Sequence, residues 1–146
     1  MRLSWPEWLL SATAIAIIAI GVFFVIVRPP FLAEDLRYIG ASEEALRASA
    51  PRLAQWLSLV FRVMGGFIIA TGVLLLATVL TADLSRQPLT LLAVAIAAAM
   101  SLGNMAAVNF LIGSDFKWLI LAVAGLWTAG IVAQLMQSKQ QLADLT

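Results

Sequence analysis

The sequence contains no cysteine and no histidine among its 146 residues. Without them the chain has no disulfide, no thiol nucleophile and none of the usual zinc or histidine-ligated haem sites. The absence of histidine also removes the side chain that most often transfers protons near neutral pH. We therefore expect no metal site and no cofactor.

Charged residues are scarce as well. They make up 12% of the chain, whereas apolar residues make up 62%, and soluble domains average about 25% and about 45–50% respectively. A chain this short cannot bury so much apolar surface in a water-soluble core. The net charge of +1 gives no indication of nucleic-acid binding. Composition therefore predicts one small membrane domain whose surplus apolar surface faces lipid.

Four long apolar runs follow one another along the chain. Each is long enough, as a helix, to cross a hydrocarbon core of about 30 Å. The predicted spans are residues 8–27, 56–81, 89–112 and 116–136. We expect an all-α fold in which residues 1–146 form a single four-helix up-down membrane bundle.

Residues 28–54 form the extramembrane connector between the first two spans. Pro29 and Pro30 end the first span, and Gly40 is placed to end a short helix. Ser42 is a candidate N-cap for a second short helix. Two interpretations stay open: a lid that lies on the membrane surface, or a connector whose apolar residues rest on the end of the bundle.

Arg62 lies inside the second apolar run and is the most unusual residue of the sequence. An arginine in such a place needs water, a lipid headgroup or hydrogen-bond acceptors. Asn104 in the third span falls at a similar depth, so we expect the second and third spans to pack with Arg62 hydrogen-bonded to Asn104. The candidate ligand-binding residues are Arg62, Asn104, Ser58, Ser101 and Asn109.

This set has two interpretations. In the first, Arg62 closes a pocket and its guanidinium binds the carboxylate or phosphate of a lipid or other amphiphile. In the second, Arg62 orients the helix or extends to the headgroups, while the asparagines join helices. Small residues predict close helix packing at Gly65, Gly66, Ala70 and Gly72. We expect Gly66 to matter more than Gly72, because it follows Arg62 by one turn.

Catalysis is not expected. No nucleophile and base can be paired within reach, and the acidic residues fall outside the apolar runs. The leading interpretation is a non-enzymatic membrane protein that binds a lipid-like or apolar ligand, or another membrane protein. Two alternatives stay open: a small oligomeric channel or carrier, and an accessory or structural subunit of a membrane complex. The expected partners are membrane lipids and a second copy of the chain or another membrane protein.

Short motifs add a resemblance. The second span reads Phe61-Arg62-Val63-Met64-Gly65-Gly66, and Gly113-Ser114-Asp115 precedes the fourth span. This arrangement resembles a broad bacterial group of uncharacterised four-helix membrane proteins, loosely DoxX-like, with an Arg-x-x-Gly-Gly element in helix two. The resemblance implies a four-helix fold in the bacterial inner membrane and carries no agreed activity. Members often have an arginine in the third helix, where this chain has only Ser101 and Asn104.

Overall fold

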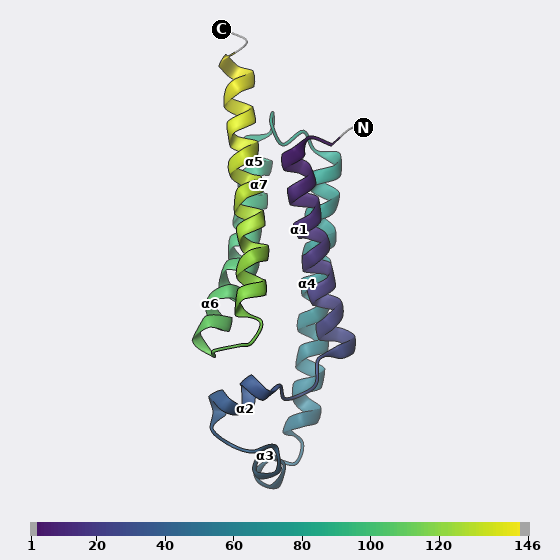
Figure 1. The fold of residues 1–146 in the computed structure, drawn as a ribbon. Coiled ribbons are helices and arrows are strands. Elements are labelled where there is room, and N and C mark those ends of the chain that lie inside the picture. The colour runs from purple at the N-terminus through teal and green to yellow at the C-terminus, as the bar shows by residue number, and fades with distance from the viewer. Residues whose placement is uncertain (1–2, 144–146) are drawn as a thin grey trace.

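The computed structural model describes residues 3–143 as helices joined by short turns (Figure 1). The helices are α1 (Trp5–Val22), α2 (Ala33–Ile39), α3 (Glu43–Ser49), α4 (Leu53–Thr81), α5 (Pro88–Ala98), α6 (Asn104–Leu111) and α7 (Lys117–Ala143), with π-helical turns η1 (Phe23–Val27) and η2 (Ala99–Gly103). Four stretches are long and apolar enough to cross a membrane: Trp5–Val27, Leu53–Thr81, Pro88–Leu111 and Lys117–Gln140. The predicted all-α four-helix fold is confirmed.

The predicted helix boundaries in the connector follow from local backbone chemistry. Ser42 caps α3, because its Oγ accepts a hydrogen bond from the Ala45 amide at 3.2 Å. Gly40 ends α2 with φ of 72°, a left-handed conformation that suits glycine. Pro51 precedes the second span. It lies in a turn, and α4 begins at Leu53.

The third span is helical over Pro88–Leu111, close to the predicted residues 89–112, but it contains a π-helical turn that the sequence did not indicate. The π-helical turn η2 separates α5 from α6. One π turn inserts an extra residue into the helical repeat and rotates the side chains that follow it. Asn104 at the start of α6 therefore faces a different direction from the one that a regular helix would give.

The helices pack as two groups. The central helix α1 packs along both α4 and α7, while α5, η2 and α6 pack against α7. Figure 1 shows α1 and α4 side by side, next to the group of α5, α6 and α7. In the described part of the chain, α4 and α5 are not among the helix pairs in extensive contact. The predicted packing of the second span on the third is therefore wrong, because the second span packs on the first.

Glycines allow the backbones of α1 and α4 to touch. A Cβ atom built on Gly65 would lie 2.7 Å from the carbonyl oxygen of Gly21 and 2.9 Å from Cβ of Phe24. One built on Gly72 would lie 3.0 Å from the carbonyl oxygen of Ala14. The distances at Gly65 exclude a Cβ atom unless the helices shift, and the distance at Gly72 is tighter than most Cβ contacts, so both glycines are part of the helix contact.

Gly66 and Ala70 lie outside this contact, which corrects their predicted role. A Cβ atom on Gly66 would meet nothing within 4 Å, and Ala70 is exposed. The reason is geometric: Gly65 and Gly72 are seven residues apart and share one face of α4. Gly66 and Ala70 are four residues apart and share another.

Candidate functional site

The structure does not bring the predicted ligand-binding residues together. Arg62 is exposed, and it makes no hydrogen bond or ion pair with any residue of the described range 3–143. Asn104 is exposed too, at the start of α6. The expected hydrogen bond between Arg62 and Asn104 is therefore wrong, and the helices that carry these residues are not in extensive contact.

The depth of Arg62 in the membrane explains why its guanidinium needs no partner from the protein. Gly72 lies against Ala14 and Ile18, near the middle of the first span. Arg62 precedes Gly72 by ten residues, or about 15 Å of helix. That is about half the thickness of a hydrocarbon core, so the guanidinium reaches the headgroup boundary. A role for Arg62 in binding a lipid phosphate stays a prediction.

The other predicted polar residues are satisfied within their own helices. Ser58 donates to the Ala54 carbonyl at 3.1 Å, and Asn109 donates to the Met105 carbonyl at 2.9 Å. Ser101 in η2 donates to the carbonyl of Ala98 at 3.4 Å. These hydrogen bonds use the side-chain donors locally, so the residues do not form a converging polar site.

Arg28, unlike Arg62, is held in place by other side chains of the protein. Arg28 follows η1, and its Nη2 lies 2.9 Å from Oδ2 of Asp35 in α2, with the two side chains 9% and 19% exposed. The Arg28 guanidinium lies over the Phe61 ring of α4, with its Cζ 3.6 Å from the ring centroid. Oδ2 of Asp35 also accepts from the Leu32 amide at 2.9 Å. The ion pair and the ring contact fix the start of the connector on α4.

The connector is also tied to the turn between α6 and α7. Glu34 is only 4% exposed, and its Oε1 accepts a hydrogen bond from the buried Ser114 hydroxyl at 3.0 Å. Ser114 in turn accepts from the Phe116 amide at 3.1 Å, as expected of a residue that caps the fourth span. Arg37 pairs with Asp115 at 2.8 Å on the surface. These contacts join α2 to the end of the bundle through polar side chains, whereas the connector interpretation expected apolar ones.

Sequence reasoning missed Arg28, Asp35 and Glu34 as interacting residues. A usable signal was present: Arg28 directly follows an apolar run and precedes an acidic pair at Glu34 and Asp35. The chain bends at Pro30, and the side chains of Arg28 and Asp35 form an ion pair. What the sequence does not show is that Phe61 lies beneath the guanidinium, because that contact depends on the pairing of α1 with α4.

An apolar groove runs between α4 and the third span. One stretch of about 540 Å³ is lined by α4 and α5, including Leu74, Thr78, Ala93 and Ala97. A second stretch of about 240 Å³ lies among α1, α4 and the η2–α6 segment. Thr71 lines both stretches, so they adjoin there. The groove exists because α4 packs on α1 and leaves its other side without a helix partner.

The polar atoms of this groove are already hydrogen-bonded. Thr71 donates its hydroxyl to the Phe67 carbonyl at 2.9 Å, and Thr78 donates to the Leu74 carbonyl at 2.8 Å. Ser101, which lines the second stretch, also donates its hydroxyl to the Ala98 carbonyl. Arg62 lines neither stretch. The groove therefore offers apolar contact and requires no hydrogen bond from an occupant.

Comparison of the chain with protein-family models, with curated proteins and with solved structures found no match. The likeness to the DoxX-like group stays a prediction. What the structure shows is a small multi-pass helical membrane protein with a docked connector and a lateral apolar groove.

Proposed function

We propose that this protein is a non-enzymatic membrane protein that holds a lipid acyl chain in the groove between α4 and the third span. One observation carries the proposal. In the described part of the chain α4 and α5 are not in extensive contact, and the space between them is lined by apolar side chains and by hydroxyls that are already bonded.

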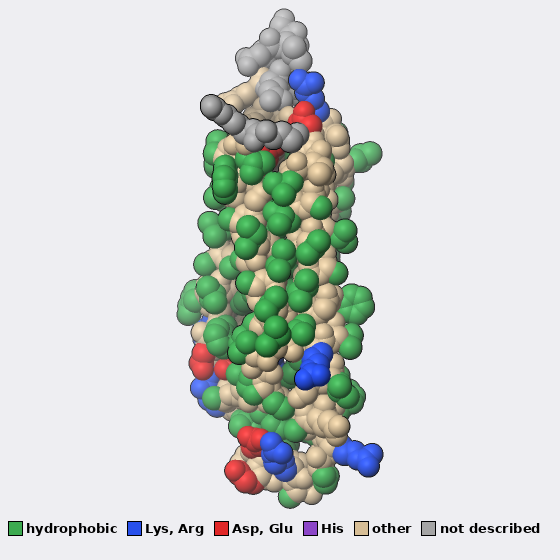
Figure 2. Space-filling view, turned by 90° about the vertical axis from the view of Figure 1, so that its right-hand side faces the viewer, with side chains coloured by type: hydrophobic (Ala, Val, Ile, Leu, Met, Phe, Trp, Pro, Cys, Tyr) green, Lys and Arg blue, Asp and Glu red, His purple; other side chains and the backbone are tan. Residues whose placement is uncertain are grey.

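The position of the groove supports a hydrocarbon occupant. Thr71 lies next to Gly72, which packs against the middle of the first span. The groove is therefore at the depth of the acyl chains, and side chains of the central belt are largely apolar (Figure 2). An acyl chain fills such a space without leaving a polar group unsatisfied.

Native mass spectrometry of delipidated protein tests the proposal. After the loosely bound lipids have been removed, we expect one lipid to stay bound to the wild type. The same lipid should be lost from Ala97→Phe, because the phenylalanine ring fills the groove. Ala70→Phe is the matched control, because Ala70 lies on the exposed face of α4. A lipid with a photoactivatable acyl chain should label groove residues such as Leu74. Equal retention by all three proteins would refute the proposal.

The other interpretations stay predictions. These are a small oligomeric channel or carrier, an accessory subunit of a membrane complex, and a location in the bacterial inner membrane. If a membrane protein docks on this chain, the exposed face of α4 with Arg62, Gly66 and Ala70 is the surface to test. Subunit number in native mass spectra should then change for Gly66→Phe.

A further inference from the structure

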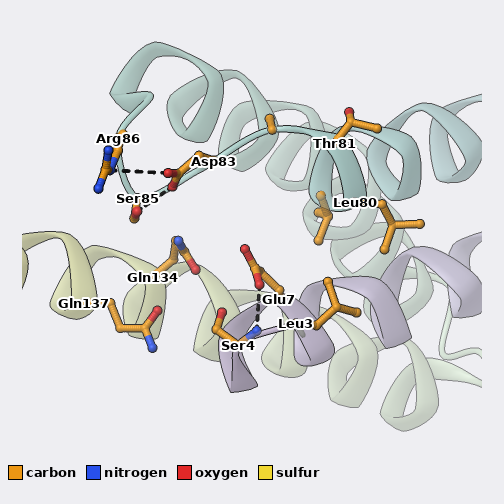
Figure 3. Close-up of a pocket in the computed structure, with 12 residues that line it drawn as sticks. Leu3, Ser4, Glu7, Leu80, Thr81, Asp83, Ser85, Arg86, Gln134 and Gln137 are labelled. Atoms are coloured by element: carbon orange, nitrogen blue, oxygen red, sulfur yellow. Dashed lines mark hydrogen bonds and ion pairs between the residues drawn. The ribbon is translucent and has the colours of Figure 1, made fainter. Parts of the chain in front are cut away.

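A cavity separate from the groove lies at the end of the bundle opposite the connector. Its volume is about 370 Å³, and its walls are the first turn of α1, the turn between α4 and α5, and α7 (Figure 3). Its lining includes the polar residues Ser4, Glu7, Asp83, Arg86, Gln134 and Gln137.

This cavity lies at the membrane boundary. α1 begins here, α4 ends here and α5 begins here. The rings of Trp5 and Trp8 in the same turn of α1 are 61% and 63% exposed, and tryptophans of this kind concentrate at the headgroup level. Apolar side chains of Val79 and Leu80 line one side of the cavity. A lipid headgroup is therefore within reach of its polar side.

Gln134 places an unpartnered hydrogen-bond acceptor in the lining of the cavity. Its side chain is 2% exposed, and its Oε1 is buried with no partner among the described residues. Figure 3 shows this amide extending from α7 toward the turn between α4 and α5. Oγ of Ser4 is also buried without a partner. A buried amide oxygen without a hydrogen bond is costly, so a ligand that donates N–H groups is favoured.

Among the described residues that line the cavity, two are acidic and one is basic. Oε2 of Glu7 accepts from the Ser4 amide at 2.7 Å, and the other carboxylate oxygen of Glu7 has no partner in residues 3–143. The Ser85 hydroxyl donates to Asp83 and lowers the pKa of that carboxyl, with Arg86 adding to the effect. Two carboxylates thus face one guanidinium, that of Arg86, which lies 3.4 Å from Asp83.

We propose that this cavity binds the primary ammonium group of an aminophospholipid, with the chemistry of phosphatidylethanolamine, from the adjoining leaflet. The three N–H donors of the ammonium match Gln134 Oε1, Ser4 Oγ and the free oxygen of Glu7. Arg86 lies at the rim, where the phosphate of such a lipid sits, and Leu80 faces its acyl chains. A choline headgroup has the same charge but no N–H donor, so it cannot satisfy these acceptors.

The test compares the two headgroups in nanodiscs that contain equal amounts of phosphatidylethanolamine and phosphatidylcholine with identical acyl chains. Native mass spectrometry counts the lipids that stay on the protein after release. We expect wild type to prefer the ethanolamine lipid roughly tenfold, which is the effect of one charged hydrogen bond. Gln134→Leu and Glu7→Gln should each lose most of this preference. Gln134→Glu keeps an acceptor oxygen and should retain it.

Gln140→Leu is the matched control, since Gln140 is exposed further along α7, and it should behave as wild type. Thermal unfolding of each variant verifies that it folds, and Glu7→Gln carries the test if Gln134→Leu does not fold. Equal retention of the two lipids by wild type would overturn the proposal, as would an unchanged preference in both variants. Free ethanolamine added to phosphatidylcholine nanodiscs should stabilise the wild type less than the ethanolamine lipid does. Equal stabilisation would assign the site to a soluble amine and overturn the lipid source.

Discussion

Gly65 and Gly66 are adjacent, but only Gly65 lies in the contact between α1 and α4, so we expect the same substitution to affect stability differently at the two positions. Gly65→Ala places a methyl group 2.7 Å from the carbonyl oxygen of Gly21 and 2.9 Å from Cβ of Phe24. Neither atom is the end of a flexible side chain, so the helices must separate. Overpacking of this kind costs about 1–3 kcal/mol. Gly66→Ala places the same methyl group where nothing lies within 4 Å, and alanine favours the helix over glycine by up to about 1 kcal/mol.

Reversible unfolding in mixed micelles of a mild detergent and sodium dodecyl sulfate measures both variants. We expect Gly65→Ala to lower the free energy of unfolding by about 1–3 kcal/mol, while Gly66→Ala leaves it unchanged or raises it. Gly72→Ala should fall between them, because the backbone atoms nearest to its added methyl group, the Ala14 carbonyl oxygen and the Ile18 amide nitrogen, lie at 3.0 Å, whereas the nearest one to Gly65 lies at 2.7 Å. Equal free energies for Gly65→Ala and Gly66→Ala would refute the packing of α4 on α1.

Three further predictions concern the connector. Arg28→Leu should lower the free energy of unfolding by about 2 kcal/mol, because it removes a ring contact and a charged hydrogen bond. Arg62→Leu should leave the free energy of unfolding nearly unchanged. A larger loss for Arg62→Leu than for Arg28→Leu would contradict the conclusion that Arg28 is the arginine held by protein contacts. Ser114→Ala should speed proteolytic cleavage of the connector, since it removes the partner of the buried carboxylate of Glu34, and wild-type cleavage rates would argue against docking. The pKa of Glu44 lies below its ordinary value of 4.5, first because its own backbone amide donates to it and then because Ser42 does. The ionised form therefore stabilises α3 above pH 4.5, and this stability is lost as the pH falls below that value. The protection factors of the α3 amides, which correct for the pH dependence of intrinsic exchange, should fall only below that pH; a fall near pH 6 would contradict this.

The fold was predictable because its main determinant is local. Each apolar run is long enough to cross the bilayer, and turn residues such as Gly40, Ser42 and Ser114 act within a few residues of their own position. These features need no knowledge of the tertiary structure. They fix how many helices form and roughly where each one ends.

Helix pairing was not predictable from the same information. α4 carries small residues on two faces, Gly65 with Gly72 and Gly66 with Ala70, and spacing alone does not say which face meets a partner. The error at Arg62 followed from that choice, since a contact with the third span was required to give it a partner. Gln134 was missed for a related reason. A glutamine near the end of an apolar helix is ordinary until the structure shows that it is buried.

We expect the four helices to cross the bilayer with the connector on one side and the turn between α4 and α5 on the other. The chain contains no cysteine, so single cysteines report their side without a background. Ser49→Cys and Asp115→Cys should react with a membrane-impermeant maleimide from one side of sealed vesicles, and Gln87→Cys and Gln140→Cys from the other. Labelling of Ser49→Cys and Gln87→Cys from the same side would contradict the account.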